Sequence, residues 1–271
     1  IKQGFIAPLG YKLVNADYSQ LEPCAFSEAC GDEKLQQVFH MKQDLYSSIA
    51  INVWNLDASA DKKADNYLKN LYPEYRQKAK IIALAVVYGA EAGRISKLMG
   101  ISYDEAQEVI DNYLDSYPGL RKYMEECDTM VCTTGLVKTK YGRTRHLPEA
   151  KRLFDIYGYR LLDRKWVKSK GLGETAWKFK NMLNLAKNYR IQGVASHVVN
   201  RAAIAMSRKF KELGLDAQMI ANVHDEITCV CKEEQAETVR DIVRDCMQNT
   251  TKIAVPLIAE PLIGKSWAEV K

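Results

Sequence analysis

The sequence lacks the features of a secreted or membrane-embedded protein. No run approaches the roughly 18 uninterrupted apolar residues of a membrane span, and the first residues do not have the pattern of a signal peptide. The seven cysteines are an odd set without a CxxC pair, which disfavours both a disulfide framework and a zinc site. We therefore expect reduced, mostly buried thiols, a cytoplasmic location in a reducing compartment, and no membrane partner.

Internal repeats, low-complexity tracts and the charge excess of a disordered chain are also absent. With 271 residues, of which 47% are apolar, the chain can bury one large or two small cores. The net charge of +5 is uneven, because residues 138–180 contain 13 Lys or Arg against 4 Asp or Glu. Aromatic residues are interleaved with these cations, as in surfaces that bind phosphate backbones and unstacked bases. A solvated basic face over aromatic core residues would give the same pattern.

The order of the expected elements indicates an α+β fold. Strand patterns occur near both ends of the chain, and helical periodicity dominates the middle. This order suggests one sheet domain interrupted by a helical insertion. The expected elements are a strand at 12–17, helices to about 132, a polar insertion at 55–75, turns at 133–148, a long helix at 175–212, a strand pair at 218–231, a helix at 232–250 and a last strand.

Two acidic motifs are candidates for metal chemistry. Asp17 ends an apolar strand and Glu22 follows five residues later, so the sheet would fix a carboxylate beside an open turn. Asp225 lies within VHDE, in the middle of the later strand pair. If it occupies a hairpin tip beside Asp17, the two carboxylates converge on a metal pair suited to phosphoryl displacement. An aspartate that simply forms a turn remains the alternative at each position.

A helix at about 76–89 carries a candidate nucleotide-binding stripe. Its members recur at steps of four and so share one face, which drifts slowly round the axis. Two cations followed by an aromatic ring suit a triphosphate with its sugar and base. An ordinary amphipathic helix with a solvated Arg/Lys edge is the alternative. The members of the stripe are Arg76, Lys80, Leu84 and Tyr88.

In chain order, the segments DYSQLE, RxxxKxxxLxxxYG and VHDE resemble motifs A, B and C of the DNA polymerase I family, the family A DNA-dependent DNA polymerases. The resemblance covers essentially the whole chain. It implies template-directed DNA synthesis, in which two Mg²⁺ ions, with Mn²⁺ as a substitute, promote transfer of a dNTP to a primer 3′-OH. The partners would be primer–template DNA and dNTP, in a bacterial cell or a phage-infected host.

The resemblance also implies roles for individual residues. Asp17, Asp225 and the Tyr18 backbone carbonyl would hold the metals, with Glu226 an acidic neighbour rather than an obligate ligand. Glu22 would exclude a ribose 2′-OH, and Lys80 would donate a proton to the pyrophosphate leaving group. The nucleotide-binding residues would be Gln20, Glu22, Tyr46, Arg76, Lys80, Leu84 and Tyr88. The residues near the nucleic acid would be Gly89, Asn188, Gln192 and His224.

This sequence departs from the family pattern at several positions. Leu84 stands where the family usually has Phe or Tyr, so the ring that packs on the incoming sugar is missing. Tyr46 replaces a frequent His, and Asn184 replaces an Arg. The insertions at 55–75 and 150–180 exceed the usual family lengths, and we expect a phage-type origin from such variation.

The resemblance predicts a specific domain organisation. An antiparallel palm sheet would be interrupted by a large, mainly helical fingers insertion, with residues 1–40 and 188–271 in the palm and 41–187 in the fingers, including a basic insertion at 138–180. The thumb and exonuclease domains of the family have no counterpart in this sequence. We expect them in the same gene or on a separate polypeptide, and we expect poor processivity from this chain alone.

Three other functions remain open from the sequence. A single-subunit RNA polymerase shares the K-x7-YG helix and an HD strand, but Glu22 leaves little room at the 2′ position. A non-catalytic nucleic-acid-binding remnant of the fold would not need the carboxylates and cations to be intact. A metal nuclease also needs clustered carboxylates, but not the stripe of Arg76, Lys80 and Tyr88.

Overall fold

The computed structural model describes residues 2–270, which form two compact units. The first unit contains the chain up to Ala25 and from Gln192 onward, and the second contains Phe26–Ile191. The two units divide after Ala25 and after Ile191, whereas the expected domain boundaries follow residues 40 and 187. The larger difference is at the first boundary. The reason is local: Asp32 accepts a hydrogen bond of 2.8 Å from the backbone N–H of Gly119, which ties this early segment to the helical unit.

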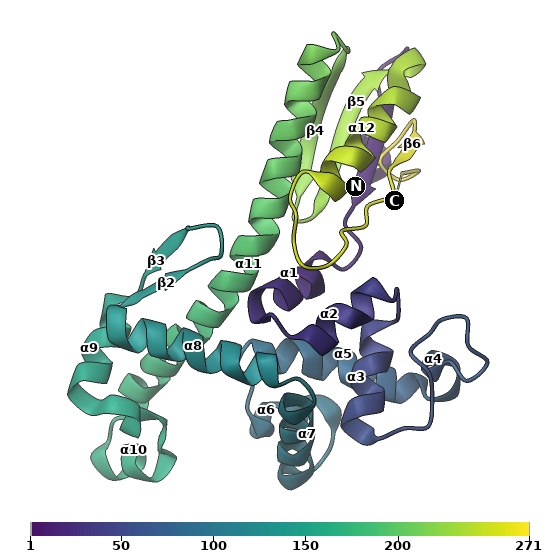
Figure 1. Ribbon diagram of the computed structural model, residues 1–271. Helices are drawn as coiled ribbons and strands as arrows, with labels where there is room; N and C mark the ends of the chain where they lie inside the picture. The colour runs from purple at the N-terminus through teal and green to yellow at the C-terminus, as the bar shows by residue number, and fades with distance from the viewer. Residues whose placement is uncertain (1, 271) are drawn as a thin grey trace. The chain divides into compact units, whose positions relative to one another are not determined.

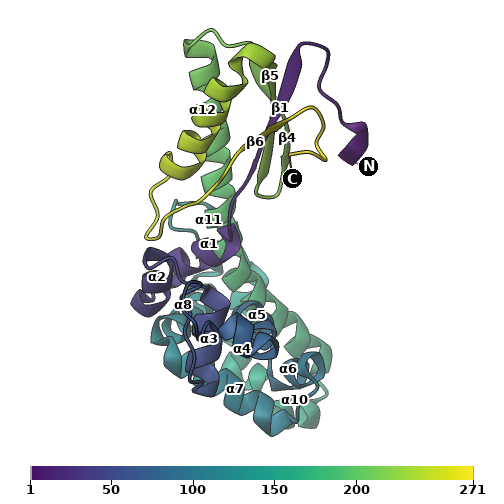
Figure 2. The ribbon, with the colours of Figure 1, turned by 90° about the vertical axis from the view of Figure 1, so that its right-hand side faces the viewer.

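A four-stranded antiparallel sheet forms the centre of the first unit. Its order, β4-β5-β1-β6, places the first strand between two strands from the end of the chain. Figures 1 and 2 show α12 (Ala236–Asn249) along one side of this sheet. The α+β class and the sheet interrupted by a helical middle are therefore confirmed. The strands are β1 (Tyr11–Asp17), β4 (Ala217–Val223), β5 (Glu226–Lys232) and β6 (Leu262–Gly264).

Alternate residues of β1 point to opposite faces of the sheet. Both faces of the strand are covered. On one face Leu13 packs with Val270 in a small apolar cluster. On the same face the Asn15 side-chain amide donates a hydrogen bond of 2.9 Å to the Val270 carbonyl. On the helix side, the Tyr18 hydroxyl donates a hydrogen bond of 2.8 Å to the carbonyl of Met247 in α12. The strand is thus held rigidly up to its last residues.

The second unit is almost entirely helical, and its helix starts follow local sequence rules. Pro73, Pro118 and Pro148 each begin a helix, where the missing N–H has no intrahelical partner to lose. Ser102 and Glu105 form a reciprocal capping box. The α-helices before α12 are α1 (Leu21–Cys30), α2 (Glu33–His40), α3 (Leu45–Trp54), α4 (Leu68–Leu71), α5 (Pro73–Val87), α6 (Ala92–Met99), α7 (Tyr103–Ser116), α8 (Pro118–Thr134), α9 (Pro148–Tyr157), α10 (Arg164–Lys170) and α11 (Gly173–Glu212). The short 3-10 helices are η1 (Lys2–Gly4), η2 (Gly158–Leu162) and η3 (Glu233–Gln235).

The structure refines two segments that the sequence left as loops or turns. Within 133–148, β2 (Leu136–Lys138) and β3 (Thr144–His146) pair as a short antiparallel hairpin, seen beside α8 and α9 in Figure 1. Within 55–75, the chain forms the single turn α4 before α5 begins. Three-residue strands carry too little alternation to be recognised from sequence, which is why the hairpin was missed.

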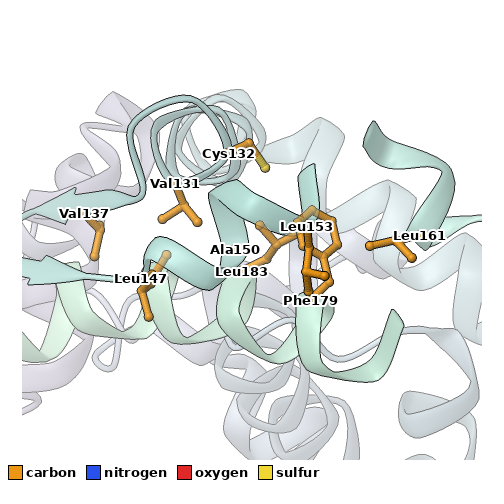
Figure 3. Close-up of a cluster of buried hydrophobic side chains, with 10 residues drawn as sticks. Val131, Cys132, Val137, Leu147, Ala150, Leu153, Leu161, Phe179 and Leu183 are labelled. Carbon is orange, nitrogen blue, oxygen red and sulfur yellow. The ribbon is translucent and has the colours of Figure 1, made fainter. Parts of the chain in front are cut away.

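The basic segment contributes to a hydrophobic cluster that also includes buried residues from α8, β2 and the part of α11 beyond residue 180. Leu153, Leu161 and Phe179 are among the buried side chains of this cluster that Figure 3 labels. Partly buried aromatic residues pack against the cluster, namely Phe154, Tyr157, Trp166 and Tyr189. Much of the aromatic content is therefore core, as the simpler interpretation held. Trp177, in contrast, is 64% exposed.

The described residues bear on two further expectations. No helix among residues 2–270 combines the length and the apolar composition needed to cross a membrane. All seven cysteines are free and six of them are buried, as expected. Burial raises the pKa of the Cys24 and Cys229 thiols to about 12, so these thiols stay protonated at neutral pH.

The cluster in Figure 3 gives a direct test of the fold. Phe179→Ala removes a fully buried ring and should lower the free energy of unfolding by about 3–5 kcal/mol, measured by urea unfolding. The control Ile156→Ala truncates a side chain that is 59% exposed and should change it by no more than about 0.5 kcal/mol. Equal unfolding midpoints for the two variants would contradict the assigned core.

Candidate active site

Asp17 and Asp225 lie at neighbouring ends of two adjacent strands of one sheet. Asp17 is the last residue of β1 and is paired in register with Glu226, the first residue of β5. Asp225 lies in the two-residue turn between β4 and β5. The Tyr18 backbone N–H donates a hydrogen bond of 3.4 Å to the Asp225 carbonyl. The expected hairpin tip beside the strand end is therefore present, with Asp17 exposed and Asp225 half-buried.

The turns beside these carboxylates hold unusual backbone conformations. Gln20, in the turn between β1 and α1, and His224, in the β4–β5 turn, both have a φ of +58°. A non-glycine residue in this left-handed region costs on the order of 1–3 kcal/mol, and such strain persists where the surrounding structure enforces it. A hydrogen bond of 3.0 Å from the Cys24 N–H to the Gln20 carbonyl is one such restraint.

A pocket of about 490 Å³ opens beside Asp225. It brings together four residues predicted from the sequence, namely Glu22, Gln192, His224 and Asp225, with Leu21, Ala195, Ser196 and Val199 completing the lining. Burial raises the pKa of Glu22, and the negative charge of Asp225 raises it further. The two carboxylates therefore repel one another, and a cation bound at this end of the sheet would offset that repulsion.

Glu226 differs from its neighbours in being only 5% exposed. Its carboxylate accepts a hydrogen bond of 2.5 Å from the indole N–H of Trp267. This oxygen is therefore engaged by the protein.

The two aspartates at the strand ends resemble the few protein ligands of a magnesium site. They do not resemble a metal site in which the protein supplies every ligand. Among residues 2–270, no three His, Cys, Asp or Glu side chains gather into a metal-binding group. Asp17 and Asp225 instead supply two carboxylates on adjoining backbone segments. Mg²⁺ is commonly held by one or two carboxylates, while water and substrate phosphates complete its coordination. The residues present therefore fit Mg²⁺ bound together with a phosphorylated substrate.

In the helical unit, the exposed face of α5 borders a second pocket, of about 330 Å³. Lys80, Leu84 and Tyr88 line it, as their spacing predicted. Arg94 of α6 also lines it and was missed, because it lies beyond the motif that carried the prediction. The remaining lining residues are Gln77, Ile81, Ala85 and Leu98. This pocket combines cations with apolar and aromatic surface, which suits a nucleotide.

Arg76 does not line that pocket, because a buried carboxylate holds it. Its Nε and Nη2 atoms lie 2.7 and 2.9 Å from the two oxygens of Asp44. Asp44 is 2% exposed and caps α3 by accepting a hydrogen bond of 3.1 Å from the Ser47 N–H. The ring of Tyr46 lies 5.5 Å from the Arg76 guanidinium. Asp44 was missed by sequence reasoning, although an Asp three residues before Ser47 has the spacing of a helix cap.

Gly89 lies just after the C-terminal end of α5, at a point where only glycine fits. Its φ is +78°, and a Cβ there would lie 2.0 Å from the Asn184 side-chain oxygen in α11. Both the backbone conformation and the close approach exclude a side chain. The close approach to Asn184 is thus a structural reason for glycine at this position.

Two other predicted residues carry buried polar atoms without a hydrogen-bond partner in the described chain. These atoms are the Tyr88 hydroxyl and the Asn188 side-chain carbonyl. Such atoms are rare in folded proteins and call for a specific explanation, such as a bridging water or a ligand. Gln192 follows Asn188 by one turn of α11 and is exposed.

The family model for DNA polymerase family A matches residues 1–269. The chain belongs to DNA polymerase family A. The motif resemblance is therefore confirmed over essentially the whole chain.

Curated relatives in family A include bacterial DNA polymerases I. The enzyme of Pseudomonas aeruginosa is 31% identical over 269 residues, which cover 99% of this chain and 26% of that protein. The thermostable DNA polymerase I of Thermus aquaticus is 30% identical over 271 residues, which cover 100% of this chain and 29% of that protein. The chain thus spans less than a third of the length of these relatives.

A solved family A structure has the same fold. The POL domain of Pol1 from M. smegmatis, in complex with DNA primer-template and dNTP, matches with a TM-score of 0.81 at 26% identity. The match covers 100% of this chain and 42% of that chain. The described fold is therefore that of the corresponding part of a family A polymerase.

The ion pair of Arg76 predicts a pH-dependent stability. Burial disfavours ionisation of Asp44, but hydrogen bonds from Arg76 and Ser47 outweigh it and hold the pKa of Asp44 below its ordinary value. The stabilisation is then complete above the unfolded pKa of about 3.9 and is lost as the pH falls through the lower folded pKa. Asp44→Asn should lower the free energy of unfolding at neutral pH by about 3–5 kcal/mol.

Urea unfolding at a series of pH values checks this expectation. The difference between wild type and Asp44→Asn should shrink as the pH falls below about 4. The control Asp65→Asn, at an exposed position in the loop before α4, should show no such difference. A pH-independent loss in Asp44→Asn would refute the ion-pair explanation.

Proposed function

We propose that this chain carries the palm and fingers of a DNA-directed DNA polymerase that transfers a dNTP to a primer 3′-OH by two-metal nucleotidyl transfer. The sheet unit would be the palm and the helical unit the fingers. The observation that carries the proposal is the pairing of β1 with β5, which brings Asp17 next to the turn holding Asp225. Membership of family A supports the same reaction.

The palm residues bind and orient the reacting groups. Asp17, Asp225 and the Tyr18 carbonyl would hold two Mg²⁺ ions, for which Mn²⁺ can substitute. Bound there, the ions would lower the pKa of the primer 3′-OH and stabilise charge on the phosphates. His224, at the exposed hairpin tip, would contact the primer terminus, and Gln20 would lie near the primer–template or nucleotide.

Sugar selection follows from the position of Glu22. It lines the same pocket as Asp225 and is partly buried, and its side chain would occupy the volume that a ribose 2′-OH needs. Glu22 would thus discriminate against ribonucleotides by steric exclusion, which favours DNA synthesis over the RNA polymerase alternative.

The fingers residues would bind the incoming nucleotide. Lys80, exposed at the pocket on α5, would hold the phosphates and donate a proton to the leaving pyrophosphate. Leu84 and Tyr88 would border the sugar and base, with Gly89 near the templating base. Arg76, with Tyr46 beside it, would reach the triphosphate only while sharing its charge with Asp44.

The remaining contacts concern the nucleic acid and the rest of the protein. The unpaired Asn188 carbonyl and the exposed Gln192 amide would read the minor groove near the primer end. A thumb and exonuclease part, in the same gene or on a second polypeptide, would supply the grip on the duplex. The chain covers 26–29% of the length of these relatives.

Substitution of the carboxylates tests the metal assignment. Asp17→Asn and Asp225→Asn each keep the side-chain volume but remove a charged ligand. Each should lower the rate of Mg²⁺-dependent primer extension by about 10²-fold or more. The matched control Glu234→Gln, at an exposed position in the same unit, should keep the wild-type rate. Unchanged extension by either aspartate variant would show that the assignment is wrong.

A second test concerns sugar selection. Glu22→Ala opens the space beside Asp225 and should raise the incorporation of rNTP relative to dNTP by about 10- to 100-fold. Competitive single-nucleotide incorporation on one primer–template measures this ratio. Glu22→Gln, which keeps the volume without the charge, should stay near the wild-type ratio. If Gln has the same effect as Ala, selection depends on charge and the steric explanation fails.

A further inference from the structure

The segment from Gly158 to Lys170, which comprises η2 and α10, concentrates positive charge, and most of its cations form no ion pair among residues 2–270. The acidic residues around it are already engaged. Glu149, Asp155 and Glu174 pair with cations three or four residues away on their own helices. Asp163 caps α10 by accepting hydrogen bonds of 2.9 and 3.2 Å from two backbone N–H groups. Four cations of the segment have no ion pair within residues 2–270, namely Arg160, Lys165, Lys168 and Lys170.

An exposed aromatic ring lies next to this segment. Trp177, in the first turns of α11, is 64% exposed and forms no aromatic pair among the described residues. It lines a pocket of about 160 Å³ together with Arg164 and Leu162. At this exposure the indole offers a large flat surface on which another ring can stack.

The cations beside Trp177 are held in place by one carboxylate. Glu91 pairs with Arg164 at 2.6 Å and also with Lys180, and all three line the same pocket. Burial disfavours the charge of Glu91, but the bonds from these two cations outweigh it, so the pKa of Glu91 lies below its ordinary value. The pocket wall thus keeps one net positive charge next to the exposed ring.

We propose that Trp177 and the cations of the η2–α10 segment form a binding surface for single-stranded nucleic acid. A base would stack on the indole, and the phosphates on either side would contact Arg164 and the lysines of α10. This combination of an aromatic platform with a basic track is the one that sequence-tolerant single-strand binding needs. A duplex does not offer an unstacked base, and an acidic protein segment does not need the exposed ring.

The inference rests on the proposed function only for the identity of the strand, which would be the unpaired template. Binding itself can be measured without catalysis.

Fluorescence anisotropy of a labelled oligothymidylate compares the wild-type protein with Trp177→Ala and with the triple variant Lys165→Gln, Lys168→Gln, Lys170→Gln. A charge-matched control replaces Lys62, Lys63 and Lys69, which are exposed in the loop and turn at α4, by Gln.

We expect Trp177→Ala to weaken single-strand binding by about fivefold or more, and Trp177→Phe to retain most of the affinity. The triple variant should reduce the slope of log affinity against log salt by up to about 2, since each phosphate contact contributes about 0.7 for single strands. The control triple variant should leave both quantities near wild type.

Three outcomes would overturn the inference. Wild-type affinity in both test variants would show that the surface does not bind nucleic acid. An acidic protein partner would then be the explanation for the exposed basic surface. An equal loss for blunt duplex and single strand would show a charge effect without stacking. An equal loss of affinity in the control triple variant would show that the position of the lysines on the protein does not matter for binding.

Primer extension separates this inference from the proposed function. On a template with a one-nucleotide overhang, both test variants should extend as well as wild type. On a long overhang at low DNA concentration, they should extend less. If the wild type extends neither substrate, the proposed function fails; if it extends both and the variants bind the oligothymidylate normally, only the inference fails.

Discussion

The antiparallel pairing of β1 with β5 is the constraint on which the rest of the site depends. It sets Asp17 opposite Glu226 and puts the Tyr18 N–H within 3.4 Å of the Asp225 carbonyl. Side chains alternate along a strand, so a slip of one residue would turn Asp17 to the opposite face of the sheet. The buried contacts on both faces of β1 oppose that slip, and they thereby fix carboxylates that are more than two hundred residues apart in the sequence.

The helical unit uses a different device to fix its functional side chains. Asp44 caps α3 and at the same time holds Arg76 of α5, so one buried carboxylate joins two helices. Gly89 then allows α5 to end in contact with Asn184. Between these two points, Lys80, Leu84 and Tyr88 face a common pocket. The departures from the family pattern at Tyr46 and Asn184 thus lie at the two places that position α5.

Sequence reasoning succeeded where a motif and a periodic pattern agreed. Asp17 and Asp225 lie at the expected strand end and hairpin tip, because such positions can be recognised from local alternation and turn residues. It failed where one residue has a distant partner: Asp44 has a recognisable cap spacing, but its pairing with Arg76 depends on how α3 packs on α5. Arg94 joins the pocket for the same reason. The hairpin β2–β3 was missed because its strands are too short to show a period.

The central claim is that Asp17 and Asp225 act as one metal-binding unit. The most direct test is a double-mutant cycle in which electron paramagnetic resonance measures Mn²⁺ binding. The measurement is made in the presence of dNTP and primer–template. The claim predicts that Asp17→Asn and Asp225→Asn each weaken Mn²⁺ binding, and that the double variant weakens it by clearly less than the sum of the two single effects. Strictly additive effects, or wild-type binding in either single variant, would contradict it.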